Sequence, residues 1–301
     1  TKMTTMDKDY LFAPREARKE MKEVANGEFG GERALFAVEN VRLTDCIFHA
    51  GESALKRTAN IEAVRCRFEG KYPFWHTDGF TVKECEFTPG ARAALWYSRN
   101  LKMSDTRVDA PKMFREMDGV ELTGVTIPDA QETLWSCRGV KLRDVEVKNA
   151  DYLLQHSADI DIDRYRQQGN YSFQYCNNVV IRNAVIDSKD AFWETDNVTI
   201  YDSELTGEYL GWHSKNLRLV RCKINGTQPL CYCRNLKVED CEFGPECDLA
   251  FEDSDVEATV STAIVSVKNP RSGTIKALAI GETIKDANIL APADCKIETK
   301  L

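Results

Sequence analysis

A phrase of about twenty residues recurs along most of this chain and constrains its fold more than any other feature. Each copy opens on Asn, Gly or Asp and continues with alternating apolar and polar residues, as in Asn40–Phe48 and Asn60–Phe68. Successive opening residues are 19 to 21 positions apart. They are Asn40, Asn60, Gly79, Asn100, Gly119, Gly139, Asp159, Asn178, Asn197, Asn216, Asn235 and, less clearly, Asp255.

This repeat predicts a stack of coils. A unit of this length cannot bury its own apolar face, so its stability must come from packing on the next unit. Alternation predicts strands with one face in a core, and Asn, Gly or Asp at the start of a unit suits a turn with left-handed backbone. The frame of leucine-rich repeats is missing. We therefore predict an all-β protein, a single-stranded right-handed parallel β-helix (solenoid) of about twelve coils.

We expect one domain with a cap at each end, because the open ends of such a stack expose unpaired backbone groups. Residues 1–29 are the N-terminal segment, in which residues 14–25 are predicted to form an amphipathic capping helix. Residues 30–260 are the β-helix. Residues 261–301 are expected to be strands and turns that cap the other end.

Composition argues against several kinds of partner. The net charge is −8, from 40 basic and 48 acidic residues, which disfavours nucleic acid and acidic membrane surfaces. No apolar run is long enough to span a membrane. Eleven Cys, an odd number behind an N-terminus without the pattern of a secretory signal, indicate free thiols in a reducing compartment. We expect a cytoplasmic protein and leave open whether it forms a homo-oligomer.

Residues at one repeat position stack into a column, and the opening residue defines position 0. Eight Cys fall into two columns of otherwise small residues, at positions +6 and −2. They are Cys46, Cys66, Cys85, Cys222 and Cys241 at +6, and Cys137, Cys176 and Cys233 at −2. A column spreads one thiol per coil, whereas zinc needs four converging ligands. We therefore interpret these Cys as small core residues and predict no metal site and no cofactor.

All five Trp fall at position −4, and position −5 is mostly Leu or Phe. If the Leu/Phe column is the core, alternation turns the Trp outward. Position −6 is mostly small, which predicts a trough beside the Trp column; its residues include Ala34, Ala54, Pro73, Ala94, Thr133, Ser172 and Ala191. Alternation alone leaves open which of the polar columns at −8, −7 and −3 faces outward. The alternating charges at +2 are interpreted as an ordinary solvated face.

Aromatic rings beside carboxylates and basic groups suit sugars, because rings stack on the apolar face of a pyranose and charged groups bind its hydroxyls. The alternative is that the Trp pack against a terminal segment or another protomer. We predict a carbohydrate partner in a Trp-lined groove. The predicted substrate-binding residues are Trp75, Trp96, Trp135, Trp193, Trp212, Arg33, Arg92, Tyr97, Lys189, Tyr209 and His213.

Hydrolysis of a glycosidic bond typically uses two carboxyl groups. The candidate catalytic acids on this face are Asp190, Glu208, Glu132 and Asp151. Asp190 and Glu208 fall on adjacent coils, so roughly 5–8 Å should separate them if both point outward. The predicted function is that of a glycoside hydrolase acting on an oligosaccharide.

Two alternatives remain open. A polysaccharide or oligosaccharide lyase would use a basic residue to remove a proton or to neutralise a uronate, and a Tyr as proton donor. The basic candidates are Arg92, Lys71, Lys112 and Lys189, and the Tyr candidates are Tyr97 and Tyr152. The other alternative is a non-catalytic β-helix that binds a sugar or a protein through the same surface.

Several phrases resemble a bacterial family known only as domain of unknown function 3737. They are Gly31–Phe36, Gly51–Lys56, Ala91–Tyr97, Lys189–Trp193, Gly207–Trp212 and Leu249–Glu252. The resemblance covers residues 30–285 and implies a right-handed β-helix of the pectate-lyase-like type. It implies no catalytic residues, and the chain lacks the Asp-Asp and calcium-ligand signatures of the pectinases.

Overall fold

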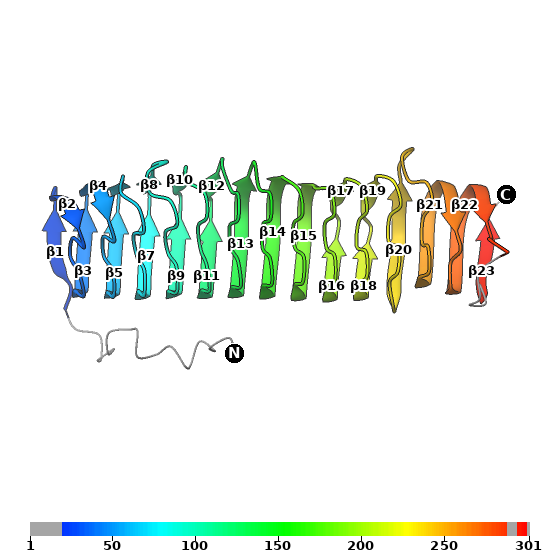
Figure 1. The fold of residues 1–301 in the computed structure, drawn as a ribbon, viewed down its shortest axis with the longest axis horizontal. Coiled ribbons are helices and arrows are strands. Elements are labelled where there is room, and N and C mark those ends of the chain that lie inside the picture. Colours follow the sequence, from blue (N-terminus) through cyan, green and yellow to red (C-terminus); the bar gives the residue numbers. More distant parts are fainter. Residues whose placement is uncertain (1–19, 288–293, 300–301) are drawn as a thin grey trace. The chain divides into compact units, whose positions relative to one another are not determined.

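The computed structural model describes residues 20–287 and 294–299, and their contacts divide the chain into two compact units, one up to residue 150 and one from residue 151. Each unit is a right-handed parallel β-helix, and the described residues contain strands and turns but no helix. Figure 1 shows the strands of each unit following one another in chain order. The predicted fold class is confirmed, whereas a single domain stays a prediction.

Two parallel ladders run through the first unit. Strands β1, β3, β5, β7, β9, β11 and β13 form one ladder, and β2, β4, β6, β8, β10 and β12 form the other. The strands are β1 (Lys22–Ala25), β2 (Glu28–Glu32), β3 (Glu39–Thr44), β4 (Ile47–Glu52), β5 (Ala59–Val64), β6 (Arg67–Phe68), β7 (Asp78–Lys83), β8 (Glu86–Phe87), β9 (Arg99–Ser104), β10 (Arg107–Val108), β11 (Asp118–Thr123), β12 (Thr126–Ile127) and β13 (Arg138–Val147).

The second unit continues the same pattern with longer strands. Strands β14, β15, β16, β18, β20, β21, β22 and β23 pair in parallel in that order, and β17 and β19 form a second ladder between β15 and β20. The strands are β14 (Ala158–Gln168), β15 (Asn177–Asp187), β16 (Asp196–Tyr201), β17 (Glu204–Thr206), β18 (Lys215–Val220), β19 (Lys223–Asn225), β20 (Leu236–Phe243), β21 (Asp255–Lys268), β22 (Ser272–Ile284) and β23 (Asp294–Thr299).

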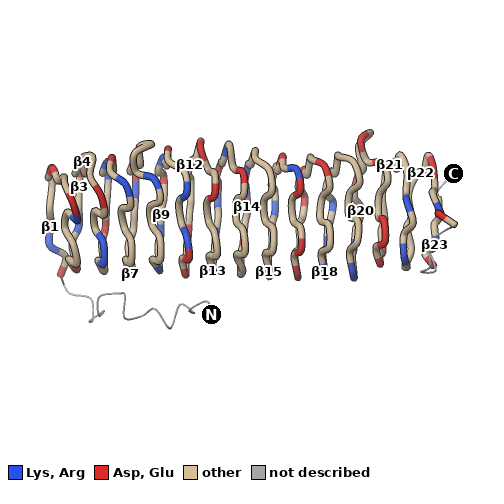
Figure 2. The backbone as a smooth tube through the Cα atoms, viewed as in Figure 1, with Lys and Arg blue, Asp and Glu red and all other residues tan. Residues whose placement is uncertain are grey.

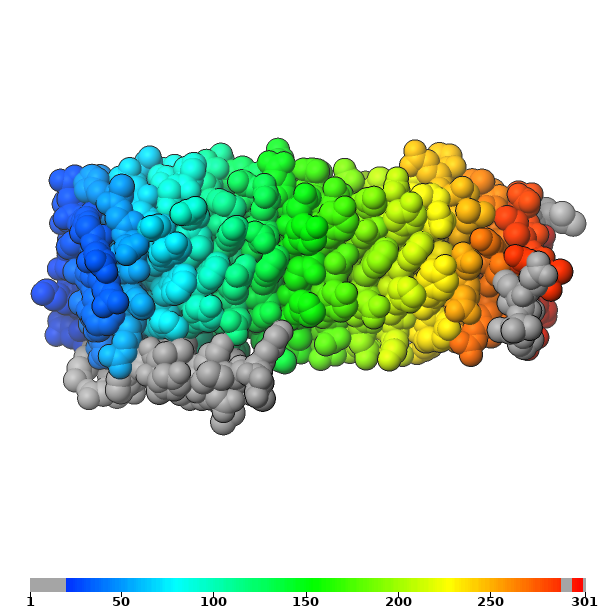
Figure 3. All heavy atoms as spheres, viewed as in Figure 1, coloured from blue at the N-terminus to red at the C-terminus, as the bar shows by residue number. Residues whose placement is uncertain are grey.

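The register places identical repeat positions side by side, so each inward column becomes a ladder of like side chains. Val120 pairs with Leu101 on one side and Val140 on the other. Phe173 and Phe192, at position −5, are both fully buried, and their rings stack with centroids 4.5 Å apart. In Figure 3 the colours change in bands along each unit, because each coil packs on its neighbours in sequence. The Leu/Phe column is therefore core, as predicted.

The corner between positions −7 and −3 has left-handed backbone at every second residue, although few of these residues are glycine. In one coil, Ser53, Leu55 and Arg57 have φ of 60°, 57° and 58°. Their N–H groups bond alternately to the next and to the preceding coil: Leu55 N donates to Ala34 O at 2.8 Å, and Arg57 N donates to Trp75 O at 2.8 Å. Left-handed backbone costs a non-glycine residue roughly 1–2 kcal/mol, and these bonds offset part of that cost.

This corner corrects one prediction about the columns. Positions −6 and −5 both face the core, and positions −4 and −3 both face outward, so simple alternation does not apply. The small residues at −6 line the core instead of forming a trough: Ala94, Thr133 and Ser172 are 0% exposed and Ala191 is 2% exposed. Positions −8 and −7 lie at the surface on the other side of the corner.

The ends of the chain also differ from expectation. The helix predicted over residues 14–25 is wrong at its described end, since Lys22–Ala25 form strand β1, which pairs with β3; residues 14–19 lie outside the described residues. Beyond residue 260, β22 and β23 extend the parallel stack. Coils therefore continue past both limits of the predicted repeat, and about twelve is too few.

One coil is one residue shorter between its core column and its next strand, which shifts the predicted columns. Tyr232 N donates to Glu252 O at 2.6 Å, as Tyr175 N donates to Trp193 O at 2.9 Å. Glu252 therefore occupies position −4 and Asp253 position −3, where its φ is 51°. Phe251, which the sequence places in the Trp column, is fully buried in the core column instead.

The Cys prediction holds for all eleven residues, which are free thiols and buried. Burial raises the pKa of Cys137 and of Cys233 to about 12. These thiols are therefore protonated and unreactive at neutral pH, as expected of core residues. No helix among the described residues is long and apolar enough to cross a membrane.

Position 0 carries a ladder of amides on the surface of the second unit. The Nδ2 of Asn197 donates to Asn178 Oδ1 at 2.9 Å, and the Nδ2 of Asn235 donates to Asn216 Oδ1 at 2.7 Å. Each of these residues has left-handed backbone, with φ of 53° to 59°. Asn is suited to both tasks, because it tolerates this conformation and its amide is both donor and acceptor.

Replacing Asn197 separates these two contributions. Asn197→Gly removes the ladder bond but keeps an easy left-handed backbone, so we expect a loss of about 0.5–1 kcal/mol in the free energy of unfolding. Asn197→Ala adds backbone strain and should lose roughly 1 kcal/mol more. Urea denaturation of both variants measures the difference. Equal losses would show that the backbone conformation at position 0 carries no cost.

Candidate functional site

The outward Trp column makes a structural contact that cannot be predicted from the sequence. The indole N–H of each of four Trp donates to the position −7 carbonyl of the next coil. The pairs are Trp75 to Ala93 (2.7 Å), Trp96 to Lys112 (2.7 Å), Trp193 to Tyr209 (2.6 Å) and Trp212 to Gln228 (2.8 Å). Gln174, at the same position, makes the equivalent bond to Asp190 O at 2.9 Å. These side chains therefore tie the corners of adjacent coils together.

The flat faces of the Trp rings are largely covered by their neighbours. Trp193 and Trp212 stack at 5.2 Å with an angle of 5° between their planes. In the first unit, the Arg115 guanidinium lies 4.2 Å from the Trp96 ring and 4.6 Å from the Trp135 ring. All five Trp are half-buried. They present ring edges to solvent, so they do not form the open platforms that the sequence suggests.

Asp190 is the most unusual carboxyl group of this face. It lies at position −7 of the second unit, half-buried, and its Oδ1 is buried without a hydrogen-bond partner among the described residues. Burial raises the pKa of Asp190 above its ordinary 3.8; the nearby Glu208 charge adds to this rise and the Lys189 charge opposes it. Position −7 carries Tyr171 on the preceding coil and Tyr209 on the following one, so the same position is aromatic on both adjacent coils.

Glu208 and Lys189 complete this cluster. Asp190 N donates to Glu208 O at 2.9 Å, which fixes the two residues on adjacent coils as predicted. The Nζ of Lys189 lies 4.0 Å from Glu208 Oε2, and both side chains are about half exposed, at 43% and 51%. Lys189 Nζ also lies 5.8 Å from the centroid of the Tyr209 ring. The second unit thus holds a half-buried acid beside an exposed carboxylate, with an ammonium group near that carboxylate and near a phenol ring.

The other two predicted catalytic acids have structural partners. Asp151 Oδ1 accepts a bond from Asn170 N at 2.8 Å, which caps the corner of the next coil. Glu132 belongs to the first unit, where it pairs with Lys112 at 3.5 Å. The cluster of four acids expected from the sequence therefore reduces to the pair Asp190 and Glu208.

The remaining predicted binding residues are distributed over both units. In the first unit, the Arg33 guanidinium lies over the Phe36 ring at 5.5 Å, Arg92 is exposed, and Tyr97 stacks on His76 at 5.3 Å. In the second unit, the Tyr209 ring meets Trp212 at 5.1 Å, and His213 stacks on Tyr232 at 4.9 Å. Among the described residues, no group of three or more His, Cys, Asp or Glu side chains could hold a metal ion.

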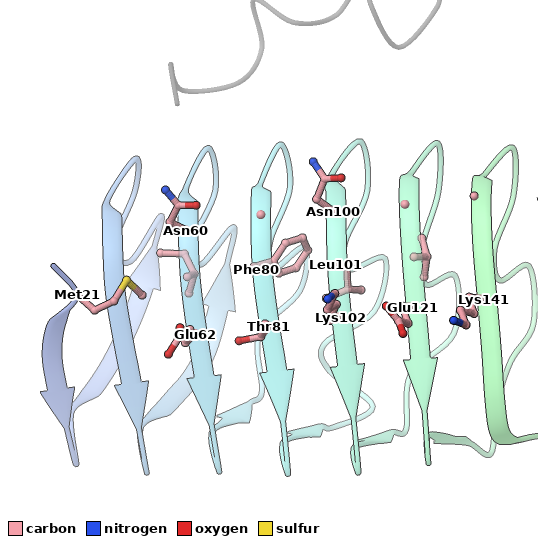
Figure 4. Close-up of a pocket in the computed structure, with 15 residues that line it drawn as sticks. Met21, Asn60, Glu62, Phe80, Thr81, Asn100, Leu101, Lys102, Glu121 and Lys141 are labelled. Carbon is pink, nitrogen blue, oxygen red and sulfur yellow. The ribbon is translucent and has the colours of Figure 1, made fainter. Parts of the chain in front are cut away.

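A groove lies on a different face of the first unit, over the strands whose position +2 charges the sequence assigns to solvent. Its volume is about 630 Å³, and it crosses strands β5 to β13. Figure 4 shows Glu62, Thr81, Lys102, Glu121 and Lys141 along it. Gly79, Gly119 and Gly139 line it at position 0, where the second unit has its amide ladder. Sequence reasoning missed this groove, although the glycines at position 0 were a visible signal.

Charges of both signs are spread over each unit. Figure 2 shows acidic and basic residues interspersed along the strands instead of gathered in one block. The ion pair of Arg218 with Glu239 at 2.9 Å and that of Arg221 with Asp202 at 2.7 Å are typical of the surface. Exposed pairs of this kind contribute little to stability.

Comparison with known proteins identifies a family. A family model with the description "Protein of unknown function (DUF3737)" matches residues 22–298, which confirms the resemblance found in the sequence. No curated protein matches the sequence.

Similar solved structures share less than a sixth of their residues with this chain. The A-module of mannuronan C-5 epimerase AlgE6 from Azotobacter vinelandii is 9% identical, with 91% of this chain and 88% of that chain covered and a TM-score of 0.31. The pentapeptide repeat protein HetL from the cyanobacterium Nostoc is 10% identical, with 78% and 92% covered and a TM-score of 0.26. The catalytic domain of a GH87 alpha-1,3-glucanase is 10% identical, with 93% and 64% covered and a TM-score of 0.24. At these scores the likeness carries no argument about function.

The raised pKa of Asp190 makes a prediction about stability. The folded protein holds this proton more tightly than the unfolded chain does, so stability falls as the pH rises from 3.8 through the raised folded pKa. Asp190→Asn removes this titration. We therefore expect the variant to gain stability relative to the wild type between pH 3 and pH 7, as measured by thermal unfolding.

The pH dependence of that difference is the informative quantity, because Asn also suits the left-handed backbone of Asp190, whose φ is 54°. A gain that is the same at pH 3 and pH 7 would reflect backbone preference alone. It would contradict a desolvated carboxylate at this position.

Proposed function

This chain belongs to the family DUF3737, and we propose that its second unit is carbohydrate-active, with Asp190 and Glu208 as the pair of carboxyl groups that hydrolyses a glycosidic bond. The observation that carries this proposal is the environment of Asp190. A half-buried acid with a raised pKa, beside a second carboxylate, is the arrangement that gives two carboxyl groups different protonation states at one pH.

The two carboxyl groups take different roles in this mechanism. Asp190 keeps its proton to a higher pH than an exposed acid does, so it is suited to protonate the leaving oxygen of the glycosidic bond. Glu208 is exposed and lies one coil away, and it supplies the second carboxylate, as base or nucleophile. Two outward side chains on adjacent coils, offset by one residue, are roughly 5–8 Å apart, a range that overlaps the carboxyl separations that glycosidases use.

The surroundings of the pair suit a sugar. Tyr209 offers a ring and a hydroxyl, and the Lys189 ammonium can donate to a sugar hydroxyl or an acetal oxygen. The edges of Trp193 and Trp212 border the same surface. The sugar would therefore contact ring edges and hydrogen-bonding groups and would not stack on an open Trp face.

Non-catalytic sugar binding is the second candidate function, and the packing of the Trp rings favours it. The faces that would hold a sugar in a cleft are occupied by neighbouring rings. The lyase is less well supported, because three of its candidate bases pair with carboxylates. Lys71 lies 3.4 Å from Glu52, Lys112 lies 3.5 Å from Glu132, and Lys189 lies 4.0 Å from Glu208.

A glycoside screen with matched variants tests the proposal. We expect Asp190→Asn and Glu208→Gln each to lower kcat by about 10²–10⁴-fold on a substrate that the wild type hydrolyses. The control is Glu204→Gln, an exposed carboxylate on β17 of the same unit, which should leave the rate unchanged. The fall in wild-type activity at high pH should follow the titration of Asp190 and should disappear in Asp190→Asn.

The outcome of the screen distinguishes the two candidate functions of this surface. Hydrolysis that both substitutions leave intact would reject Asp190 and Glu208 as the site. Glycan binding without any turnover would support the non-catalytic function instead.

A further inference from the structure

Three coils share a pair of aromatic residues at the same two positions. Each has Tyr at position −7 and His at position −3, the outward positions on the two sides of the corner. The pairs are Tyr72 and His76, Tyr152 and His156, and Tyr209 and His213. Three of the four His in the chain therefore occupy this one position.

The two coils that follow each of these pairs also resemble one another at position −3. After each His, position −3 carries Tyr on the following coil and an acid on the coil after that. The three series are His76, Tyr97 and Glu116; His156, Tyr175 and Glu194; and His213, Tyr232 and Asp253. The third series becomes visible only when the residue missing between Phe251 and Val256 is taken into account. The second and third series follow each other directly in the second unit, and together they form what we call the His–Tyr–acid row.

The geometry of the copies is closely similar. The His and Tyr rings are stacked in parallel, at 4.6 Å and 3° for His156 and Tyr175 and at 4.9 Å and 12° for His213 and Tyr232. All six residues of the row have left-handed backbone, with φ between 51° and 62°. Their side chains are exposed or half-buried.

The fold itself does not require these side chains. Position −3 holds Ala37, Arg57 and Ser136 in other coils, and their φ values of 59°, 58° and 54° match those of the row. Backbone conformation and inter-coil hydrogen bonds are therefore the same whether the residue is His, Tyr, Glu, Ala or Ser. A chemical pattern that recurs where the fold accepts almost any residue points to recognition of something outside the chain.

The period of the row indicates the form of the ligand. Three coils at ~4.8 Å per coil give a repeat of about 14 Å along the stack. Each sugar residue extends a linear glycan by about the distance between two adjacent coils. One sugar would therefore face each residue of the row. The row and its neighbours carry more acids than bases, which favours a neutral glycan over a uronate polymer. The acids are Glu194, Asp253, Asp190 and Glu208, and the bases are Lys189 and Arg234, which lies 3.2 Å from Asp253.

We propose that the His–Tyr–acid row binds a linear neutral oligosaccharide along the second unit, with its two copies contacting equivalent sugars three residues apart. The choice of a sugar rests on the proposed function. Imidazole and phenol groups donate and accept hydrogen bonds from hydroxyls, the stacked ring pair offers an apolar edge, and the acid accepts from a hydroxyl. Asp190 lies at position −7 of the Glu194 coil, on the other side of the corner from the row.

The test is the dependence of affinity on glycan length. Calorimetry with neutral oligosaccharides of two to eight residues should show a step of ~10-fold or more near six residues, because the second copy then binds at a high effective concentration. His213→Ser should remove the step and leave the affinity of short oligosaccharides unchanged. Serine is a suitable replacement, because Ser136 occupies the same position in the first unit.

His76→Ser is the matched control. The first unit has only one copy of the series, so this variant should keep the length step. The inference is overturned if affinity rises smoothly with length, if His213→Ser keeps the step with an unchanged Tm, or if no neutral glycan binds. The proposed function fails separately: a length step without hydrolysis rejects only the catalytic pair, and hydrolysis without a length step rejects only the row.

Discussion

The alternating backbone hydrogen bonds of the corner, between positions −7 and −3, are the constraint on which the rest of this structure depends. An ordinary strand would turn every second side chain inward. Here a left-handed residue at each second position keeps the inter-coil bonds in place while two successive side chains face the core and the next two face solvent. The same device occurs in both units. It explains why the core contains both the small residues of position −6 and the Leu/Phe column of position −5.

Much of the fold follows from the sequence because the repeat is long, regular and aligned by its Asn, Gly and Asp residues. Stacking of identical positions predicts the buried thiols of residues such as Cys137 and Cys233 and the Phe173–Phe192 ladder. What alternation cannot supply is the direction of side chains where the backbone is left-handed. That is why Ala94 and Ala191 were placed in a trough although they lie in the core. The residue missing after Phe251 could not be predicted for a related reason, since the repeated phrase is less clear at Asp255.

The candidate site was predictable as a region, but the environments of its side chains were not. Sequence columns brought Asp190, Glu208 and Lys189 to adjacent coils, and the structure keeps them there. The burial of Asp190 depends on side chains from neighbouring coils, which no single repeat reveals. The Trp column was misjudged because its indole N–H groups bond to main-chain carbonyls of position −7. A carbonyl turned out of the ladder by the corner geometry leaves no trace in the sequence.

The indifference of position −3 to its side chain has a consequence for how such a protein changes over evolution. Shape resides in the backbone bonds, the inward columns and the position −4 side chains that bond to main-chain carbonyls, and position −3 is free to vary one coil at a time. A substitution there alters what one level of the stack contacts and leaves the register of every other level intact. Duplication of a few coils adds copies of a contact without redesigning the core. Specificity and architecture are thus inherited through separate sets of residues within the same twenty-residue repeat.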